Sequence, residues 1–578
     1  MNQLVVPESS QSSPVCDLMA ALGASFATSR LERRLVEGEN SSGALLLSES
    51  QFVELCEAGS RPGSLAELAP GFANILVYPF SGTPKAVETL QSLVGGRVSV
   101  AAMSSSASTD YVVASSRSVC GPFAGLRIRG VLCGQDVALR VEGAAYPSEA
   151  IVTNNVGSLL TKFDLAGVNL FVLSSRAVFD ISAEHLRNLD ITQCFSGLVP
   201  LLFFLRHCQI SLPASPLRWA HWVIDDPNLR PRYGFLDLKG LVHCVRETGA
   251  AASIAFIPWN HKRTSREIVD LFKDNWPQLS ICVHGCDHTG SEFSTKTMSA
   301  AMPLIDLAMR RMSRLQAETA LGWERVMVFP QGRFSGEAMR ALRASEMLAA
   351  VNTELLDCQT GEGVKGGELL KPAIMSFGGF PLFMRRPAEE TAANFALDLI
   401  LGKPCLIVTH HQYFENGLNS LRSAVETLNG LEPELTWTNL ERGILSTYSV
   451  SAGAGEGVGV RVYSSRTLFI PPGVGTLLVS KAETDPETVE VFVDGMHVAA
   501  KPVNGDIQFA IRSSKREAMT IEARSSVPVK PQLEQSTKYR LKVTARRYLT
   551  EVRDNYLCRF PKLTARAASL QQMLQRAR

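Results

Sequence analysis

The sequence contains no pair of cysteines spaced as CxxC, although 12 cysteines are scattered over its 578 residues. This pattern argues against a disulfide framework and against a zinc module built from cysteines. The strongest apolar run, residues 198–205, is far shorter than the roughly 20 residues that a membrane-spanning helix needs. No Lys or Arg precedes Arg30, so the start lacks the charge of a secretory signal. Together, these absences predict a cytoplasmic protein without a transmembrane segment.

The sequence also lacks an excess of charge of either sign. It has 58 Lys or Arg residues against 56 Asp or Glu residues, and 45% of the chain is hydrophobic. This balance is typical of a globular protein and argues against disorder or a nucleic-acid partner. The length suggests about four folding units, or one large barrel with smaller companions.

Short apolar runs separated by Gly and Ser turns dominate the N-terminal part. They predict strands, with helical stretches such as residues 84–94 between some of them. We therefore predict an N-terminal α/β or mixed domain over residues 1–212, of unknown role. The expected strands are at residues 44–47, 74–80, 97–102, 126–132, 137–143, 150–155 and 170–175.

A different rhythm follows, in which buried strands alternate with helical patterns. Strands and helices in alternation indicate a parallel sheet, and seven strands at this spacing favour a β/α barrel, complete or deformed, over residues 213–450. The expected strands are at residues 222–224, 253–257, 280–283, 326–329, 349–351, 373–377 and 405–408.

The C-terminal part returns to alternating apolar and polar residues. It predicts a β-sandwich over residues 451–530 and a basic helical tail over residues 531–578. Between residues 530 and 578 there are 12 Lys or Arg residues and 3 Asp or Glu residues. Such a tail most often packs as an amphipathic helix on its own protein. Self-association, or docking on a partner, an anionic polymer or a membrane surface, are the alternatives.

Acidic and imidazole side chains follow the predicted barrel strands at their carboxyl ends. Asp225 and Asp226 follow the first strand, and His284 and His288 follow the third with the spacing HxxxH. Carboxyl ends of barrel strands converge on one face, where catalytic residues gather. Imidazoles and a carboxylate bind a divalent metal, and Zn²⁺ is the expected ion. The pattern predicts a metal site of both histidines with Asp225 or Asp226.

Taken in order, the motifs resemble those of the polysaccharide deacetylases, the NodB-homology family of carbohydrate esterases with a deformed β/α barrel. The resemblance covers roughly 200 to 230 residues. It implies a metal-dependent hydrolase that removes an N-acetyl or other N-acyl group from an amino sugar or glycoconjugate. The motifs are Asp225-Asp226, the HxxxH of residues 284–288, Pro330-x-Gly332 and the LxVxH of residues 406–410.

The resemblance also implies a role for each matched residue. Asp225 would be the general base toward a metal-bound water, and His410 would protonate the departing amine. His411 directly follows His410 and is the alternative acid. The turn at Gln331 would offer a backbone N–H to the oxyanion. The metal ligands would be Asp226, His284 and His288.

One departure from the family pattern concerns the arginine that orients the base. Val328 stands at its place, so either Arg333 substitutes from another direction or the base is held otherwise. Candidate substrate contacts are Arg333, Trp259, Glu292 and His411. Two other functions remain open: a carbohydrate-binding or assembly protein with an inactive barrel, and a deacylase of a non-sugar amide.

Overall fold

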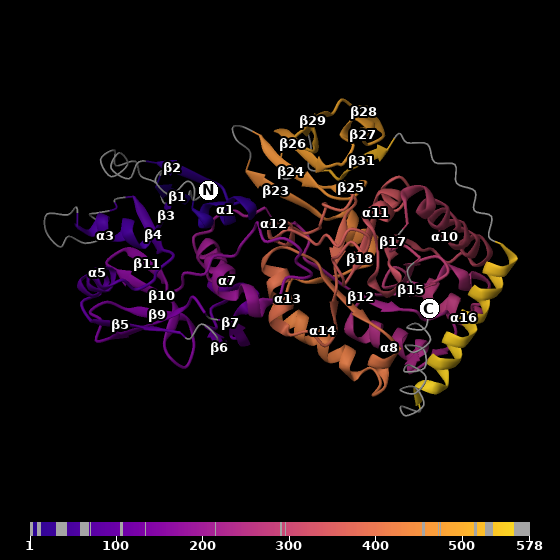
Figure 1. The fold of residues 1–578 in the computed structure, drawn as a ribbon, viewed down its shortest axis with the longest axis horizontal. Coiled ribbons are helices and arrows are strands. Elements are labelled where there is room, and N and C mark those ends of the chain that lie inside the picture. The colour runs from indigo at the N-terminus through magenta and orange to yellow at the C-terminus, as the bar shows by residue number, and fades with distance from the viewer. Residues whose placement is uncertain are drawn as a thin grey trace.

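The computed structural model describes residues 4–7, 13–29, 43–57, 69, 71–103, 108–132, 134–213, 215–289, 292–294, 296–452, 457–471, 473, 475–513, 517–525 and 536–559. In chain order, the structure contains a mixed sheet, a parallel barrel and a β-sandwich (Figure 1). The predicted fold class is confirmed. Within these ranges, no helix is both long and apolar enough to cross a membrane. The 11 cysteines in them form no disulfide with one another.

The N-terminal unit is an 11-stranded sheet in the order β2-β1-β3-β4-β11-β10-β9-β6-β7, with β5 and β8 attached to this path. Pairing is parallel from β2 to β11 and antiparallel beyond it, so the sheet is mixed. Its strands are β1 (Leu4–Pro7), β2 (Phe26–Ser29), β3 (Gly43–Leu47), β4 (Phe72–Val77), β5 (Arg97–Ala102), β6 (Ser108–Val113), β7 (Arg127–Leu132), β8 (Val137–Glu142), β9 (Ser148–Thr153), β10 (Ser158–Leu165) and β11 (Val168–Leu173).

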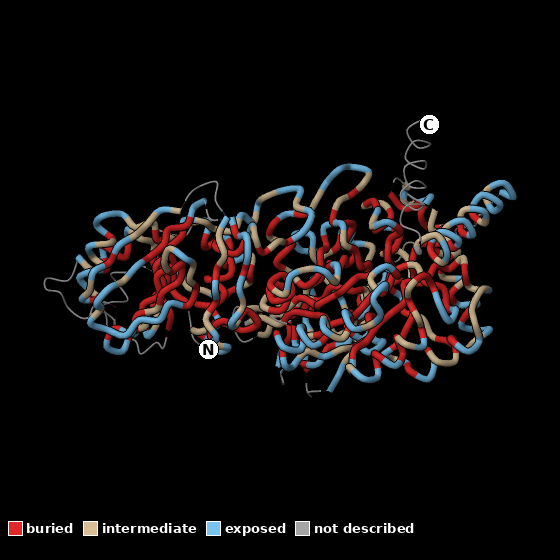
Figure 2. The backbone as a smooth tube through the Cα atoms, turned by 90° about the horizontal axis from the view of Figure 1, so that it is seen from below, coloured by how far each residue is buried: buried red, intermediate tan, exposed pale blue. Residues whose placement is uncertain are grey.

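The helices of this unit include the strongest apolar run of the sequence. That run lies within α7, where it is entirely buried. One hydrophobic cluster contains buried residues of the mixed sheet, of α7 and of the barrel. Figure 2 shows buried backbone, in red, in both units. The helices are α1 (Pro14–Ala21), α3 (Glu49–Glu57), α5 (Pro84–Val94), α6 (Arg117–Cys120) and α7 (Ile191–His207).

Eight strands form the barrel in the order β19-β18-β17-β16-β15-β12-β21-β20, and all of their pairings are parallel. They are β12 (Trp219–Asp225), β15 (Ala252–Phe256), β16 (Leu279–His284), β17 (Glu324–Val328), β18 (Ala349–Asn352), β19 (Leu382–Met384), β20 (Arg386–Pro387) and β21 (Cys405–Thr409). The surrounding helices are α8 (Leu238–Thr248), α9 (Arg266–Asp274), α10 (Met298–Thr319), α11 (Gly336–Arg343), α12 (Gly366–Leu369), α13 (Ala392–Ile400), α14 (Asn419–Leu431) and α15 (Leu440–Leu445). Short strands β13 (Arg232–Tyr233), β14 (Leu236–Asp237) and β22 (Thr436–Trp437) complete this part.

Residues 382–387 connect the two ends of the barrel sheet. β19 pairs with β18 at one end, β20 pairs with β21 at the other, and only Arg385 separates the two short strands. The sequence predicted a strand at residues 373–377 instead, and this prediction is wrong. In that segment Ile374 forms only an isolated bridge with Leu382. Gly378 and Gly379 both have a φ of +68°, so the chain turns back after the apolar run and the strand begins later.

Alternate residues of the barrel strands form layers inside the barrel. Along β12, His221 contacts Ser253 of the neighbouring strand, Val223 packs in an apolar cluster above it, and Asp225 ends the strand. The intervening residues of β12 pack in the separate cluster under the helices. This period of two places polar residues at the bottom, apolar residues in the middle and the predicted site at the top.

The C-terminal unit is the predicted β-sandwich, and its two sheets share one apolar core. One sheet contains β23 (Tyr448–Ala452), β24 (Val458–Val462), β26 (Gly475–Ala482), β30 (Asp506–Ser513) and β29 (Lys501–Val503). The other contains β25 (Arg466–Phe469), β31 (Met519–Ser525), β27 (Val489–Val493) and β28 (Met496–Val498). Of the predicted basic tail, residues 531–535 and 560–578 lie outside the described residues. The rest contains α16 (Thr537–Asn555), the yellow helix beside the barrel in Figure 1.

Candidate metal centre and active site

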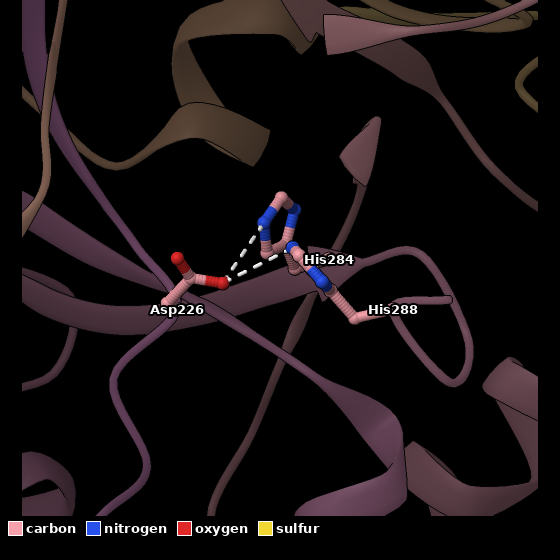
Figure 3. Close-up of side chains that lie close together, drawn as sticks. All are labelled: Asp226, His284 and His288. Carbon is pink, nitrogen blue, oxygen red and sulfur yellow. Dashed lines mark ion pairs between the residues drawn. The ribbon is translucent and has the colours of Figure 1, made fainter. Parts of the chain in front are cut away.

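Three side chains converge at the carboxyl end of the barrel. Asp226 follows β12, His284 ends β16, and His288 lies in the loop after it. Asp226 Oδ1 is 3.1 Å from His288 Nε2 and 3.6 Å from His284 Nε2, and Figure 3 shows the carboxylate facing both rings. In the part of the chain that the structure describes, no other group of three His, Cys, Asp or Glu residues brings its ligand atoms as close, within 4.8 Å of one another.

The atoms of this cluster fit a divalent metal ion. Asp226 Oδ1 is buried without a hydrogen-bond partner among the described residues. His284 Nδ1 lies 3.0 Å from the carbonyl oxygen of Val328. Because a carbonyl only accepts, Nδ1 carries the proton and Nε2 keeps a lone pair on the side of Asp226. Two ligands of a tetrahedral Zn²⁺ lie roughly 3.3 Å apart, close to both distances found here.

Asp225 lies beside this cluster and is held by an arginine that sequence reasoning missed. Arg385 donates a hydrogen bond of 2.7 Å to each carboxylate oxygen of Asp225, and both side chains are buried. Burial raises the pKa of Asp225, but the charge of Arg385 and its hydrogen bonds bring this pKa below its ordinary value. Asp225 is therefore ionised at neutral pH and able to accept a proton.

Of the two alternatives for holding the base, the structure supports the second, because Arg385 and not Arg333 contacts Asp225. The Arg333 side chain is exposed and does not line the cavity at the barrel mouth. Arg385 directly follows β19, so it lies at the carboxyl end of a barrel strand, as the other site residues do. The sequence prediction missed it because it placed this strand at residues 373–377.

The two adjacent histidines of the late strand point to different places. His410 lines the cavity, its side chain is 56% exposed, and its Nε2 lies 4.0 Å from Asp225 Oδ2. His411 is buried, lies 3.7 Å from Asp554 of α16 and packs against the rings of Tyr233 and Phe235. His410 is therefore the histidine placed at the cavity, whereas His411, a predicted substrate contact, lies outside the cavity lining.

Gln331 also borders the cavity, in a turn of unusual conformation. Its φ is +58°, and the following Gly332 has a φ of +67°. The N–H of Gly332 donates to the carbonyl of Phe329, whereas the N–H of Gln331 has no partner among the described residues. A backbone donor is therefore available at this edge of the cavity, as the predicted oxyanion contact requires.

Two predicted substrate contacts, Glu292 and Trp259, lie outside the cavity lining. Glu292 is buried and accepts hydrogen bonds from the backbone N–H groups of Cys286, Asp287 and Thr289, so it holds the loop that carries His288. Trp259 packs edge-to-face on Tyr548 of α16. Neither side chain lines the cavity, because each is directed into a loop or interface beside it.

The remaining predicted residues meet in one cavity of about 1080 Å³. They are Asp225, Asp226, His284, His288, Gln331 and His410. The opposite wall comes from α16, which packs on the barrel as the tail prediction favoured. Tyr233 donates a hydrogen bond of 2.8 Å to Asp554, and Arg263 donates one of 2.8 Å to Glu551. No pattern in the sequence predicted that this helix borders the candidate site.

No family model and no curated protein matches the sequence. The structure of Agd3, a novel carbohydrate deacetylase, matches with a TM-score of 0.45 and 10% identity, over 91% of this chain and 99% of that chain. The family 4 carbohydrate esterase from Streptomyces lividans, in complex with acetate, matches with a TM-score of 0.25 and 14% identity, over 39% and 98%. A CE4 family pseudoenzyme from Bacillus anthracis matches with a TM-score of 0.24 and 11% identity, over 40% and 69%.

The chain is similar in fold to polysaccharide deacetylases. The resemblance drawn from the four motifs stays a prediction. The candidate metal ligands lie at the carboxyl end of the barrel.

Proposed function

We propose that the protein is a metal-dependent hydrolase that removes an N-acetyl, or another N-acyl, group from an amino sugar or glycoconjugate. One observation carries this proposal: Asp226, His284 and His288 form an unsatisfied ligand cluster directly beside an ionised Asp225. All of these side chains border one cavity, so a substrate amide there has access to each of them.

Asp226, His284 and His288 would hold the metal, and Zn²⁺ suits this set of imidazole and carboxylate donors. When bound, such an ion polarises an acyl carbonyl and makes a water molecule more acidic. The Val328 carbonyl fixes the tautomer of His284 and so keeps its Nε2 free for the metal.

Asp225 accepts the proton of the attacking water, and Arg385 fixes the plane of its carboxylate through two parallel hydrogen bonds. His410 faces the cavity and donates a proton to the leaving nitrogen. The N–H of Gln331 stabilises the negative charge that develops on the acyl carbonyl oxygen. Proton removal and proton donation are thus divided between two side chains of one cavity.

Paired variants test this division. Asp226→Ala should contain no stoichiometric zinc by elemental analysis and release no acetate from acetylated amino sugars. Asp225→Asn should keep the zinc, while acetate release falls by about 10²–10⁴-fold, the contribution of a general base. His243→Ala on the exposed side of α8 is the matched control and should behave as the unaltered protein.

Full activity of Asp226→Ala would refute the proposal. A protein that binds acetylated sugars without metal or acetate release would instead be a binding protein. Release of acyl groups only from non-sugar amides would identify the third candidate function.

A further inference from the structure

The cavity wall formed by α16 is positively charged. Lys542, Arg546 and Arg553 lie on one face of this helix and line the cavity. Among the described residues, neither Lys542 nor Arg546 takes part in an ion pair, whereas Arg553 pairs with Asp554, the next residue. Two cations of this wall are therefore available to a bound molecule.

The acidic residues of α16 serve another face of the helix. Glu551 pairs with Arg263, and Asp554 accepts a hydrogen bond from Tyr233 and lies close to His411. These contacts fasten the helix to the barrel loops. Consequently the negative charges of the helix are used in docking, while unpaired positive charges face the cavity.

Arg547 adds a further uncompensated charge to the same helix. It is 1% exposed, and none of its three guanidinium nitrogens has a hydrogen-bond partner among the residues described. A buried cation without a partner is costly, so a nearby anion would stabilise it. Burial, and then the charge of Arg547, lower the pKa of the neighbouring Arg546. Like charges are therefore concentrated on this part of the helix.

The barrel side of the cavity has the opposite charge. Glu354 follows β18 and Glu389 follows β20, and both line the cavity. Throughout the described ranges, neither glutamate pairs with Lys542 or Arg546. The two walls thus keep their charges apart, and a molecule that spans the cavity meets free cations on the α16 side.

We propose that this wall, with Lys542 and Arg546 at its centre, binds an anionic group of the substrate, a carboxylate or a phosphate carried beside the acylated amino sugar. The inference rests on the proposed deacylase function and narrows it to anionic glycans or sugar phosphates. Cationic side chains paired with such oxygens through charge-assisted hydrogen bonds give both affinity and orientation.

Three acetylated probes of different charge test the inference on the zinc-loaded full chain. Chitotetraose is neutral, a hyaluronan tetrasaccharide carries carboxylates, and UDP-N-acetylglucosamine carries phosphates. Calorimetry gives the dissociation constant of each probe, and acetate release gives kcat/KM. The anionic probe of the correct class should bind about tenfold or more tightly than chitotetraose, and added salt should weaken its binding. The better of the two anionic probes tells a carboxylate from a phosphate.

Variants that each remove one positive charge distinguish an effect of the cavity wall on binding from an effect of the net charge of the helix. Lys542→Gln and Arg546→Gln should each weaken binding of the anionic probe by about tenfold and leave chitotetraose unchanged. Arg546→Lys should restore part of the loss. Lys538→Gln and Arg540→Gln change the net charge equally on the same helix but outside the cavity lining, so they should have little effect.

Equal binding of neutral and anionic probes would overturn the inference, as would no measurable binding of either anionic probe. An equal loss in the Lys538→Gln and Arg540→Gln controls would also overturn it. Acetate release from chitotetraose without any preference for anionic probes would support the proposed hydrolase and refute only the anionic subsite. Charge-dependent binding without acetate release from any probe would support the subsite and count against hydrolysis.

Discussion

Two polar layers lie inside the same barrel, and they differ in whether all their polar side-chain atoms have hydrogen-bond partners. In the lower layer, the Nδ1 of His221 donates a hydrogen bond of 2.8 Å to the carbonyl of Thr438, and its Nε2 contacts the hydroxyl of Ser253. Ser253 and Ser280 each donate a hydrogen bond of 2.7 Å to Glu324. Burial raises the pKa of Glu324 to about 7. Each polar side chain of this layer therefore has a partner.

The upper layer is not closed in this way. The Nδ1 of His284 lies beside the carbonyl of Val328, while Asp226 Oδ1 lies 3.1 Å from His288 Nε2 and 3.6 Å from His284 Nε2 without a hydrogen-bond partner among the described residues. A shared cation would bind all three groups. The hydrogen-bond partners of the buried polar atoms thus distinguish a candidate ligand site from a closed network.

The largest expected difference between the layers concerns metal. His284→Ala should abolish zinc binding and acetate release, because the cluster then keeps only two ligands. His221→Ala should retain both but lose about 2–4 kcal/mol of unfolding free energy, since it opens a cavity and leaves partners unpaired. Elemental analysis, acetate assays and urea unfolding measure these effects. Loss of zinc in His221→Ala would contradict the claim that only the upper layer binds the metal.

Arg385→Ala sharpens the contrast within the upper layer. It leaves the Asp225 carboxylate buried without its partner, which should cost about 3–5 kcal/mol in urea unfolding. Acetate release should also fall, because the base is no longer oriented. Adding Asp225→Asn to this variant should recover part of the stability but none of the activity. A double variant that is less stable than Arg385→Ala would contradict the pairing.

Glu324→Gln tests the proton of the lower layer. The unfolded chain titrates Glu324 near its ordinary 4.5 and the folded chain near 7, so the folded state binds more protons between these values. The unfolding free energy should therefore fall by about 3 kcal/mol as pH rises from 4.5 to 7. The variant should lack this part of the fall in urea unfolding at several pH values. An identical pH dependence in both proteins would show that Glu324 does not titrate there.

His410→Ala should have the smallest of these effects. The loss of a proton donor should lower kcat for an amide substrate by about 10²-fold, with zinc content and stability unchanged. An acetyl ester of an activated phenol, whose leaving group needs no proton, should be hydrolysed nearly as fast as by the unaltered protein. An equal loss on both substrates would assign His410 to a role other than proton donation.

Much of the barrel followed from local sequence. Apolar runs long enough for one strand predicted six of its strands, because strands buried on both faces contain few polar residues. The 373–377 run failed because Gly378 and Gly379 reverse the chain, and a run by itself does not show which of two neighbouring segments pairs with the sheet. Because the strand was predicted too early in the chain, Arg385 was not recognised as a residue at a strand end.

The sequence alone determined which residue types stand at the strand ends, and hence the predicted ligands and base. Only the tertiary structure decided between His410 and His411, replaced Arg333 by Arg385, and brought α16 to the cavity. The reason is physical: residues on one strand or its end keep a fixed spacing and direction, which a pattern can encode. The approach of Arg385 to Asp225, 160 residues away, depends on closure of the barrel, and the docking of α16 depends on pairs such as Arg263 with Glu551 that no local pattern contains.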